Sequence, residues 1–176
     1  MADEPDAVAN TSARHARDRG AALAEFAIVF PLLFLLIAAM LDYGMAFVSL
    51  NSARQGVREG ARQAVVANFG TSSSCTLTGG PFTESDAKLM CLTKGRIGLS
   101  ESDVRIKVAF PGANAVGNSL LVCAAYPMRS MTGVLTPMMN GKVMKSKVEM
   151  RIEKADLTLA GAEETALAGS DWTWCA

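Results

Sequence analysis

Apolar residues dominate one stretch near the N-terminus, from Phe26 to Leu41. This run is shorter than the ~20 residues of a typical spanning helix. It can be extended, because Ala21–Ala24 is small and apolar and Tyr43–Leu50 is apolar apart from one serine. A helix over residues 21–50 would be about 45 Å long at ~1.5 Å per residue, which is enough to cross a bilayer. We therefore expect residues 21–50 to form a transmembrane helix.

Two other interpretations fit a single apolar segment. A cleaved secretory signal would explain the basic residues Arg14, Arg17 and Arg19, but the apolar run exceeds the ~7–15 residues of a usual signal core. No small-residue cleavage site follows the run, since Met40 and Leu41 stand there. A buried helix of a soluble domain is the other alternative. The pattern favours a membrane anchor over both.

Residues 51–68 continue the helix with a different pattern, in which small or apolar residues recur at three- and four-residue steps and arginines line another face. The first set is Ala53, Val57, Ala61 and Ala64, and the second is Arg54, Arg58 and Arg62. We expect the first face, with Gly56 and Gly60, to pack closely under a globular domain. The arginine face is expected to be solvated, with anionic lipid headgroups or acidic neighbours as the alternative.

The remaining residues, 69–176, predict a small head domain. Residues 68–80 form a loop rich in Gly, Ser and Thr, and a short helix is expected from Thr83, as N-cap, to Lys94. Alternating or apolar patterns predict strands over residues 104–110, 120–126 and 143–152, and a short helix within residues 127–139. Trp172 and Trp174 are expected to hold the C-terminal tail. A helix followed by strands indicates an α+β class.

Charge and cysteine content suggest an orientation. The chain has 17 Lys and Arg against 17 Asp and Glu, so its zero net charge argues against a nucleic-acid partner. The basic residues before the span favour a cytoplasmic N-terminus. All four cysteines follow the span, which favours an oxidising, extracytoplasmic compartment for the head.

Four cysteines allow three disulfide pairings. We favour Cys75 with Cys91, joining the loop to the short helix, and Cys123 with Cys175, joining a central strand to the C-terminus. A zinc site is the alternative, but the sequence has no C-x-x-C spacing and its one histidine, His15, precedes the span. We expect no metal and no cofactor.

The sequence contains no G-x-S-x-G, P-loop or H-E-x-x-H motif, and its head has no histidine. We therefore expect a protein that is not an enzyme. A single-pass, membrane-anchored binding or adhesion domain is one candidate class, and an anchored hydrolase that uses carboxylates is a weaker one.

Two carboxylates lie close to the apolar run. Glu25 follows Gly20 at the entrance of the helix, where a carboxylate is costly in lipid and needs a partner. The alternative is an interfacial glutamate favoured by the helix dipole, with Gly20 as a turn residue. Asp42 is expected at the outer interface, with an intramembrane functional role as the alternative. Residues 1–19 lack apolar periodicity and are expected to be unfolded.

The segment RGAALAEFAIVFP from Arg19 to Pro31 resembles the start of TadE-like pseudopilins of the tight-adherence (Flp) pilus system. Asp42–Gly44 (DYG) and the REGAR run at Arg58–Arg62 resemble the continuation of the same family. The resemblance covers about Arg19 to Ala67 and implies a pilin-like fold, in which one long helix continues into a head with an antiparallel sheet.

The resemblance also implies processing and assembly. A membrane prepilin peptidase would cut between Gly20 and Ala21, so that residues 1–20 form a cytoplasmic leader. Glu25 would then pair with the new α-amino group of a neighbouring subunit, and Phe26 would share that assembly site. Phe26 stands where major pilins commonly have Tyr, which favours a pseudopilin over a fibre-forming pilin. The implied partners are this peptidase, other pilins and pseudopilins, the inner-membrane assembly platform and the bilayer.

Overall fold

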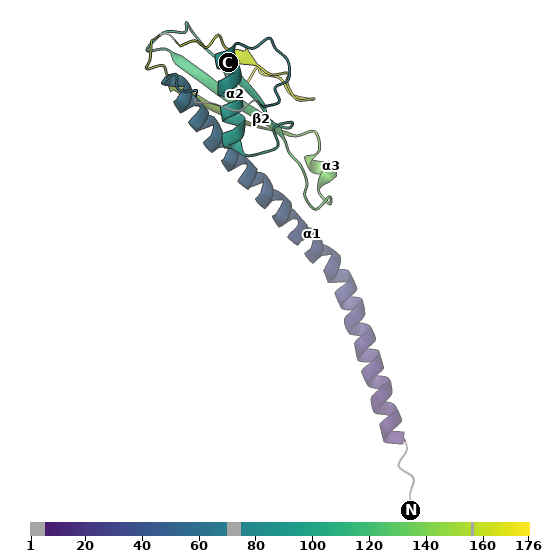
Figure 1. Ribbon diagram of the computed structural model, residues 1–176. Coiled ribbons are helices and arrows are strands. Elements are labelled where there is room, and N and C mark those ends of the chain that lie inside the picture. Colours follow the sequence, from purple (N-terminus) through teal and green to yellow (C-terminus); the bar gives the residue numbers. More distant parts are fainter. Residues whose placement is uncertain (1–5, 70–74, 156) are drawn as a thin grey trace, which may run out of the picture.

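The computed structural model describes residues 6–69, 75–155 and 157–176, with the backbone alone for residues 6–21. One long helix, α1, precedes a small head (Figure 1). The elements in chain order are α1 (Asp6–Val65), α2 (Glu84–Ile97), β1 (Arg105–Ala109), β2 (Ser119–Pro127), α3 (Thr136–Met139), β3 (Val143–Arg151) and β4 (Ala162–Glu163). The predicted α+β class, a long helix followed by an antiparallel sheet, is confirmed.

Helix α1 is continuous, and within the described residues it is the one helix long and apolar enough to cross a membrane. Its most apolar window has a mean hydropathy of 2.5 and is 6% buried. The expectation that residues 1–19 are unfolded was wrong from Asp6 onward, because the helix begins there. Alanines make up much of this polar segment and favour helix. Figure 1 shows that α1 changes direction before it reaches the head, and its exposed half contains Pro31, a residue type that removes one helical hydrogen bond.

The ends of the helices follow from local chemistry. Helix α1 ends at Val65, earlier than the expected Asn68, and Ala67 has a left-handed φ of 51°. Helix α2 begins as predicted, where the hydroxyl of Thr83 accepts a hydrogen bond from the amide of Asp86 at 3.1 Å. It continues past Lys94 to Ile97 and ends at Gly98, whose φ of 69° suits a glycine.

The sheet has the strand order β3-β2-β1-β4, and each pair is antiparallel. The three predicted strands are confirmed to within a residue or two at their ends. Strand β2 is buried on both faces, as its apolar composition predicts. The short strand β4 was missed by the sequence analysis, because two residues give no periodic pattern.

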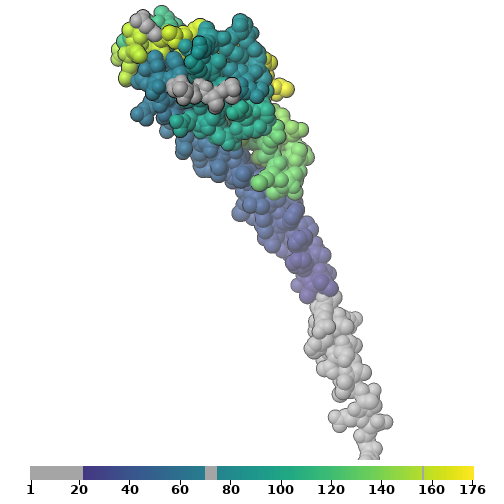
Figure 2. All heavy atoms as spheres, in the orientation of Figure 1, coloured from purple at the N-terminus to yellow at the C-terminus, as the bar shows by residue number. Residues whose placement is uncertain are grey.

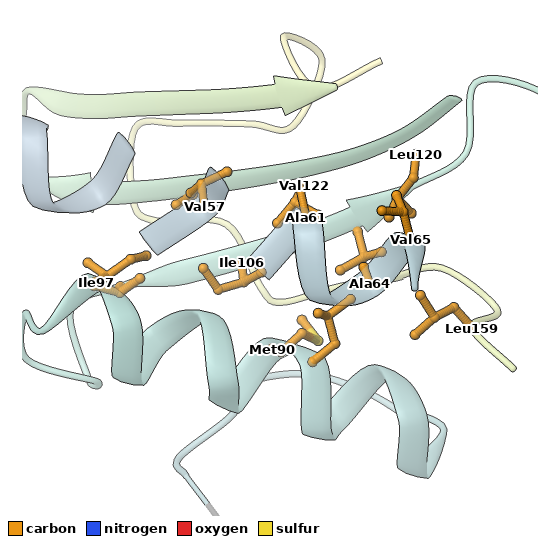
Figure 3. Close-up of a cluster of buried hydrophobic side chains, with 14 of the residues drawn as sticks. Val57, Ala61, Ala64, Val65, Met90, Ile97, Ile106, Leu120, Val122 and Leu159 are labelled. Carbon is orange, nitrogen blue, oxygen red and sulfur yellow. The ribbon is translucent and has the colours of Figure 1, made fainter. Parts of the chain in front are cut away.

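The main core lies between the sheet and the helices α1 and α2 (Figure 3). The predicted apolar face of α1 is confirmed: Ala53, Val57, Ala61 and Ala64 are fully buried. Figure 3 shows Val57, Ala61 and Ala64 of α1 in one cluster with α2 and strand residues such as Met90, Ile97 and Val122. The arginines of the opposite face are exposed, as expected for a solvated surface.

Two glycines let α1 and α2 approach each other. A Cβ at Gly56 would lie 2.6 Å from the backbone nitrogen of Ile97 and 2.8 Å from its Cα. A Cβ at Gly60 would collide with Oγ1 of Thr93. The prediction of a close approach at these small residues is therefore confirmed.

The C-terminal tail covers the other face of the sheet. Trp172, 8% exposed, packs with Leu121, Cys123 and Ala125 of β2, and its indole N–H donates to the carbonyl of Glu164 at 2.8 Å. Two disulfides, Cys75–Cys91 and Cys123–Cys175, join the same cysteines that the sequence analysis favoured. The second holds the tail to the middle of β2.

Candidate membrane anchor and assembly surface

The N-terminal half of α1 carries its apolar side chains on the outside. Leu23, Ile28 and Leu32 are each at least 69% exposed, although they are among the most apolar residues of the chain. Figure 2 shows this part of α1 projecting from the head without cover. Exposed apolar surface of this extent marks a membrane or protein contact. The arrangement is that of a single-pass membrane anchor followed by a C-terminal head.

The aromatic residues of this half form a ladder along one side of the helix. The rings of Phe26 and Phe30 are 5.3 Å apart between centroids, and those of Phe30 and Phe34 are 6.1 Å apart. Phe26 itself is 60% exposed. Its ring is therefore available to lipid or to a neighbouring chain.

The predicted processing and assembly residues lie at the start of this surface. The backbone of Gly20 and Ala21 is helical and continuous with the apolar segment. Glu25 is exposed, and none of the ion pairs between described residues includes it. The structure thus places Glu25 and Phe26 on the open surface of one helix, about one turn beyond Gly20.

Farther along the helix, one stripe of small residues is buried. Ala38, Asp42 and Ala46, at successive four-residue steps, are 3%, 0% and 9% exposed. These positions lie one above another on one face of a helix. The stripe therefore marks where another part of the chain covers α1 below the main core.

Asp42 is bound by the connection between β2 and β3. Its Oδ1 accepts hydrogen bonds from the amides of Met131 at 2.8 Å and Thr132 at 2.9 Å. Its Oδ2 accepts from the hydroxyls of Ser130 at 2.7 Å and Thr132 at 2.8 Å. Hydrogen bonds to an ionised acceptor are stronger than those between neutral groups. Asp42 thus fastens residues 130–132 to the helix.

The sequence analysis expected Asp42 at an interface but missed its partners. The available signal was weak: Ser130, Thr132 and Gly133 are ordinary turn residues, and only the fold brings them to a helix residue 88 to 90 positions earlier. A buried carboxylate requires such donors. Neither the burial of Asp42 nor the identity of its donors can be read from the sequence.

A groove of about 260 Å³ lies beside this junction, between α1 and the β2–β3 connection. Tyr126 lines it, and burial raises the pKa of the Tyr126 phenol to about 12, although the charge of Arg54 acts in the opposite direction. The phenol donates to the sulfur of Met144 at 3.4 Å. Tyr126 is therefore a neutral group of the core.

Among the described residues, no three His, Cys, Asp or Glu side chains are grouped to hold a metal ion.

Comparison with known proteins gave one match. The family model described as TadE-like protein matches residues 20–62, which run from Gly20 through the apolar helix to Arg62. Residues 20–62 are therefore similar to TadE-like proteins, as the resemblance predicted. No curated protein and no solved structure matched the chain.

Proposed function

We propose that this protein is a minor pilin, or pseudopilin, that is processed by a prepilin peptidase and takes part in assembly of a tight-adherence pilus. The observation that carries the proposal is the TadE-like match at residues 20–62, which begins at Gly20 and covers the exposed apolar helix. The protein would act through assembly rather than catalysis. The biological result would be adhesion and surface attachment, with biofilm formation or DNA uptake as further outcomes.

The position of Glu25 supports this role. An exposed carboxylate at the start of an apolar helix is costly in lipid unless it is paired. Cleavage after Gly20 would create an α-ammonium group at Ala21, and the same group on a neighbouring subunit could neutralise Glu25. A buried pair can be nearly neutral in free energy, whereas an unpaired buried charge is strongly unfavourable. Glu25 would therefore set the register between subunits.

The charge pattern and the disulfides support one orientation. Residues 1–20 would be a cytoplasmic leader, and the disulfide-containing head would lie outside the inner membrane. Its partners would be the prepilin peptidase, other pilins and pseudopilins, and the inner-membrane assembly platform. The exposed ladder that starts at Phe26 would provide the helix surface that packs against other subunits.

The test is the intact mass and N-terminal sequence of the protein from membranes with and without the candidate peptidase. We expect a mature chain that begins at Ala21, and loss of processing in Gly20→Val. The matched control is Gly44→Val on the same helix, where an added Cβ meets nothing within 4 Å. This variant should be processed normally.

An uncut chain in membranes that contain the peptidase would contradict the proposal and leave an anchored binding domain as the alternative. Cleavage after Leu41 would make the protein a secreted one instead. Processing of Gly20→Val at the normal rate would also argue against a prepilin peptidase.

A further inference from the structure

The connection between β2 and β3 reaches back along α1, away from the main core. In Figure 1, α3 lies beside α1 on the side of the head nearest the exposed half of the helix, and Figure 2 shows this lobe against α1. Asp42 binds residues 130–132 of the connection through four hydrogen bonds. We call residues 130–141, which include α3, the foot.

The composition of the foot is unusual for an exposed loop. No charged residue occurs from Ser130 to Gly141, whereas Arg129 and Lys142 flank the segment on both sides. Met131 is 72% exposed and Met138 is 66% exposed. Large apolar side chains grouped on a protruding segment mark an interaction site rather than a solvated loop.

The position of the foot along α1 indicates that it lies at the boundary of the hydrocarbon core. A helix from Ala22 to Leu41 spans about 30 Å, the thickness of the hydrocarbon core, so Asp42 comes at the boundary on the head side. Ala38, about 6 Å nearer the N-terminus, is 3% exposed although Ile37 beside it is 48% exposed. The buried stripe of Ala38, Asp42 and Ala46 is therefore covered as far as the last turn of the apolar run.

The uncovered faces of α1 stay apolar at the same height. Met40 is 67% exposed, Tyr43 54% and Phe47 63%. Tyrosine, as at position 43, is enriched where a spanning helix leaves the hydrocarbon for the headgroup layer. The foot covers the Asp42 face of α1 at this same height, while the other faces stay open to lipid.

We propose that the foot is a second membrane contact, which inserts Met131 and Met138 into the headgroup layer on the head side of the bilayer that α1 spans. The flanking Arg129 and Lys142 are exposed, Arg129 in an ion pair with Asp103, and in this position both would reach lipid phosphates. The inference rests on anchoring by α1 and not on the pilus assignment. Contact at both α1 and the foot fixes the tilt of the head relative to the membrane.

The hydrogen bonds of Asp42 lower the cost of placing an irregular loop at the membrane surface. Backbone N–H groups away from water need partners within the protein. Asp42 supplies acceptors to the amides of Met131 and Thr132, while the hydroxyls of Ser130 and Thr132 satisfy its second oxygen. The polar groups of this turn are thus bound inward, and the methionine side chains are left to face outward.

The experiment places a tryptophan reporter on the foot of the full chain, reconstituted in phosphatidylcholine–phosphatidylglycerol vesicles. The variants are Met138→Trp and Met131→Trp, and the quencher is phosphatidylcholine with brominated acyl chains. The matched control is Val116→Trp, a 54% exposed apolar residue in the loop between β1 and β2, at the opposite end of β2 from the foot. The native Trp172 and Trp174 give the background signal, which is subtracted using the unmodified chain.

We expect the emission added by M138W and M131W to shift to shorter wavelength and to lose most of its intensity in brominated vesicles, while V116W changes little. Quenching of both foot variants no greater than that of V116W would overturn the proposal. Protection of the foot by a second copy of the chain, seen as M138W emission at shorter wavelength without quenching by brominated lipid, would overturn it as well. Flotation of each variant with the vesicles confirms anchoring, and no step depends on cleavage at Gly20.

Discussion

Nζ of Lys94 lies 2.8 Å from Oε1 of Glu164, and neither side chain has exposed surface. The pair joins α2 to the C-terminal segment across 70 positions of sequence. Lys94 also donates to the carbonyls of Thr76 at 2.8 Å and Glu101 at 3.2 Å. The other oxygen of Glu164 accepts from the amide of Ile106 at 2.8 Å. Both charges are therefore fully bonded inside the head.

Removing one partner of this pair should destabilise the head strongly. Lys94→Met leaves the Glu164 carboxylate buried without its cation, and breaking a buried pair typically costs about 3–5 kcal/mol. The measurement is urea unfolding of the full chain in detergent micelles, followed by the fluorescence of buried Trp172. The double variant Lys94→Met/Glu164→Leu should recover part of the loss.

The control for the buried pair is Lys107→Met, because the side chain of its partner Glu163 is 57% exposed. An exposed pair of this kind contributes less than about 1 kcal/mol. Equal losses of unfolding free energy in Lys94→Met and Lys107→Met would contradict the role assigned to burial of the pair.

The contact between α1 and α2 predicts a reversal of the usual effect of alanine in helices. Gly→Ala inside a helix normally stabilises by about 0.8–1 kcal/mol. Gly56→Ala should instead destabilise the head by roughly 1–3 kcal/mol, since its Cβ meets the backbone of Ile97, which cannot move as a flexible side chain can. Gly95→Ala in α2, where a Cβ meets nothing within 4 Å, is the control and should stabilise. Stabilisation by both variants would show that the helices separate easily.

Removal of the Asp42 carboxylate should release residues 130–132 from α1. In Asp42→Ala, the amides of Met131 and Thr132 should exchange with solvent deuterium roughly tenfold faster or more, because a hydrogen bond to a charged group contributes about 1.5–3 kcal/mol. Asp42→Asn should have a smaller effect, since its carbonyl still accepts from the backbone. Asp103→Ala, which removes only the exposed pair with Arg129, is the control. Unchanged exchange in Asp42→Ala would mean that the core alone holds the loop.

The two disulfides should differ in their contribution to stability. Cys123–Cys175 closes 52 positions of sequence and Cys75–Cys91 closes 16. Loop-closure entropy then predicts about 4 kcal/mol for the first and about 3 kcal/mol for the second. Replacing both cysteines of each pair by alanine and comparing urea midpoints tests the order. A larger loss of stability on removing Cys75–Cys91 would show that restriction of the unfolded chain is not the main source of the stabilisation.

The assembly role predicts that processing and incorporation can be separated. Glu25→Gln keeps the size of the side chain but removes the charge that would pair with the Ala21 ammonium. We expect normal cleavage after Gly20 and loss of the protein from the sheared pilus fraction, measured by immunoblot against the membrane fraction. Glu59→Gln, on the same helix beyond the apolar segment, is the control. Normal incorporation of the Glu25→Gln variant would show that the charge of Glu25 does not set the register between subunits.

Much of the fold could be predicted because its signals are local. Periodic alanines and valine from Ala53 to Ala64 define the buried face of α1, and alternation over β1 defines a half-buried strand. Thr83 is a strong N-cap regardless of what surrounds it. The short strand β4 and the buried Lys94–Glu164 pair carry no such local signal. A lysine near the end of a helix normally appears as a solvated side chain, and only the position of the C-terminal segment buries it.

In the candidate site, too, some features have a local sequence signal and others depend on long-range contacts. The apolar run, Glu25 and the TadE-like motif could be read directly, since insertion into lipid depends on the composition of one continuous segment. The sequence by itself also indicated that Asp42 stands at the outer end of that run. Only the tertiary structure decided that the partners are Ser130, Met131 and Thr132, and that the foot lies at the membrane end of the head. The reason is physical: a contact between residues 88 to 90 positions apart is set by how the sheet packs on α1, and no pattern within either segment encodes that distance.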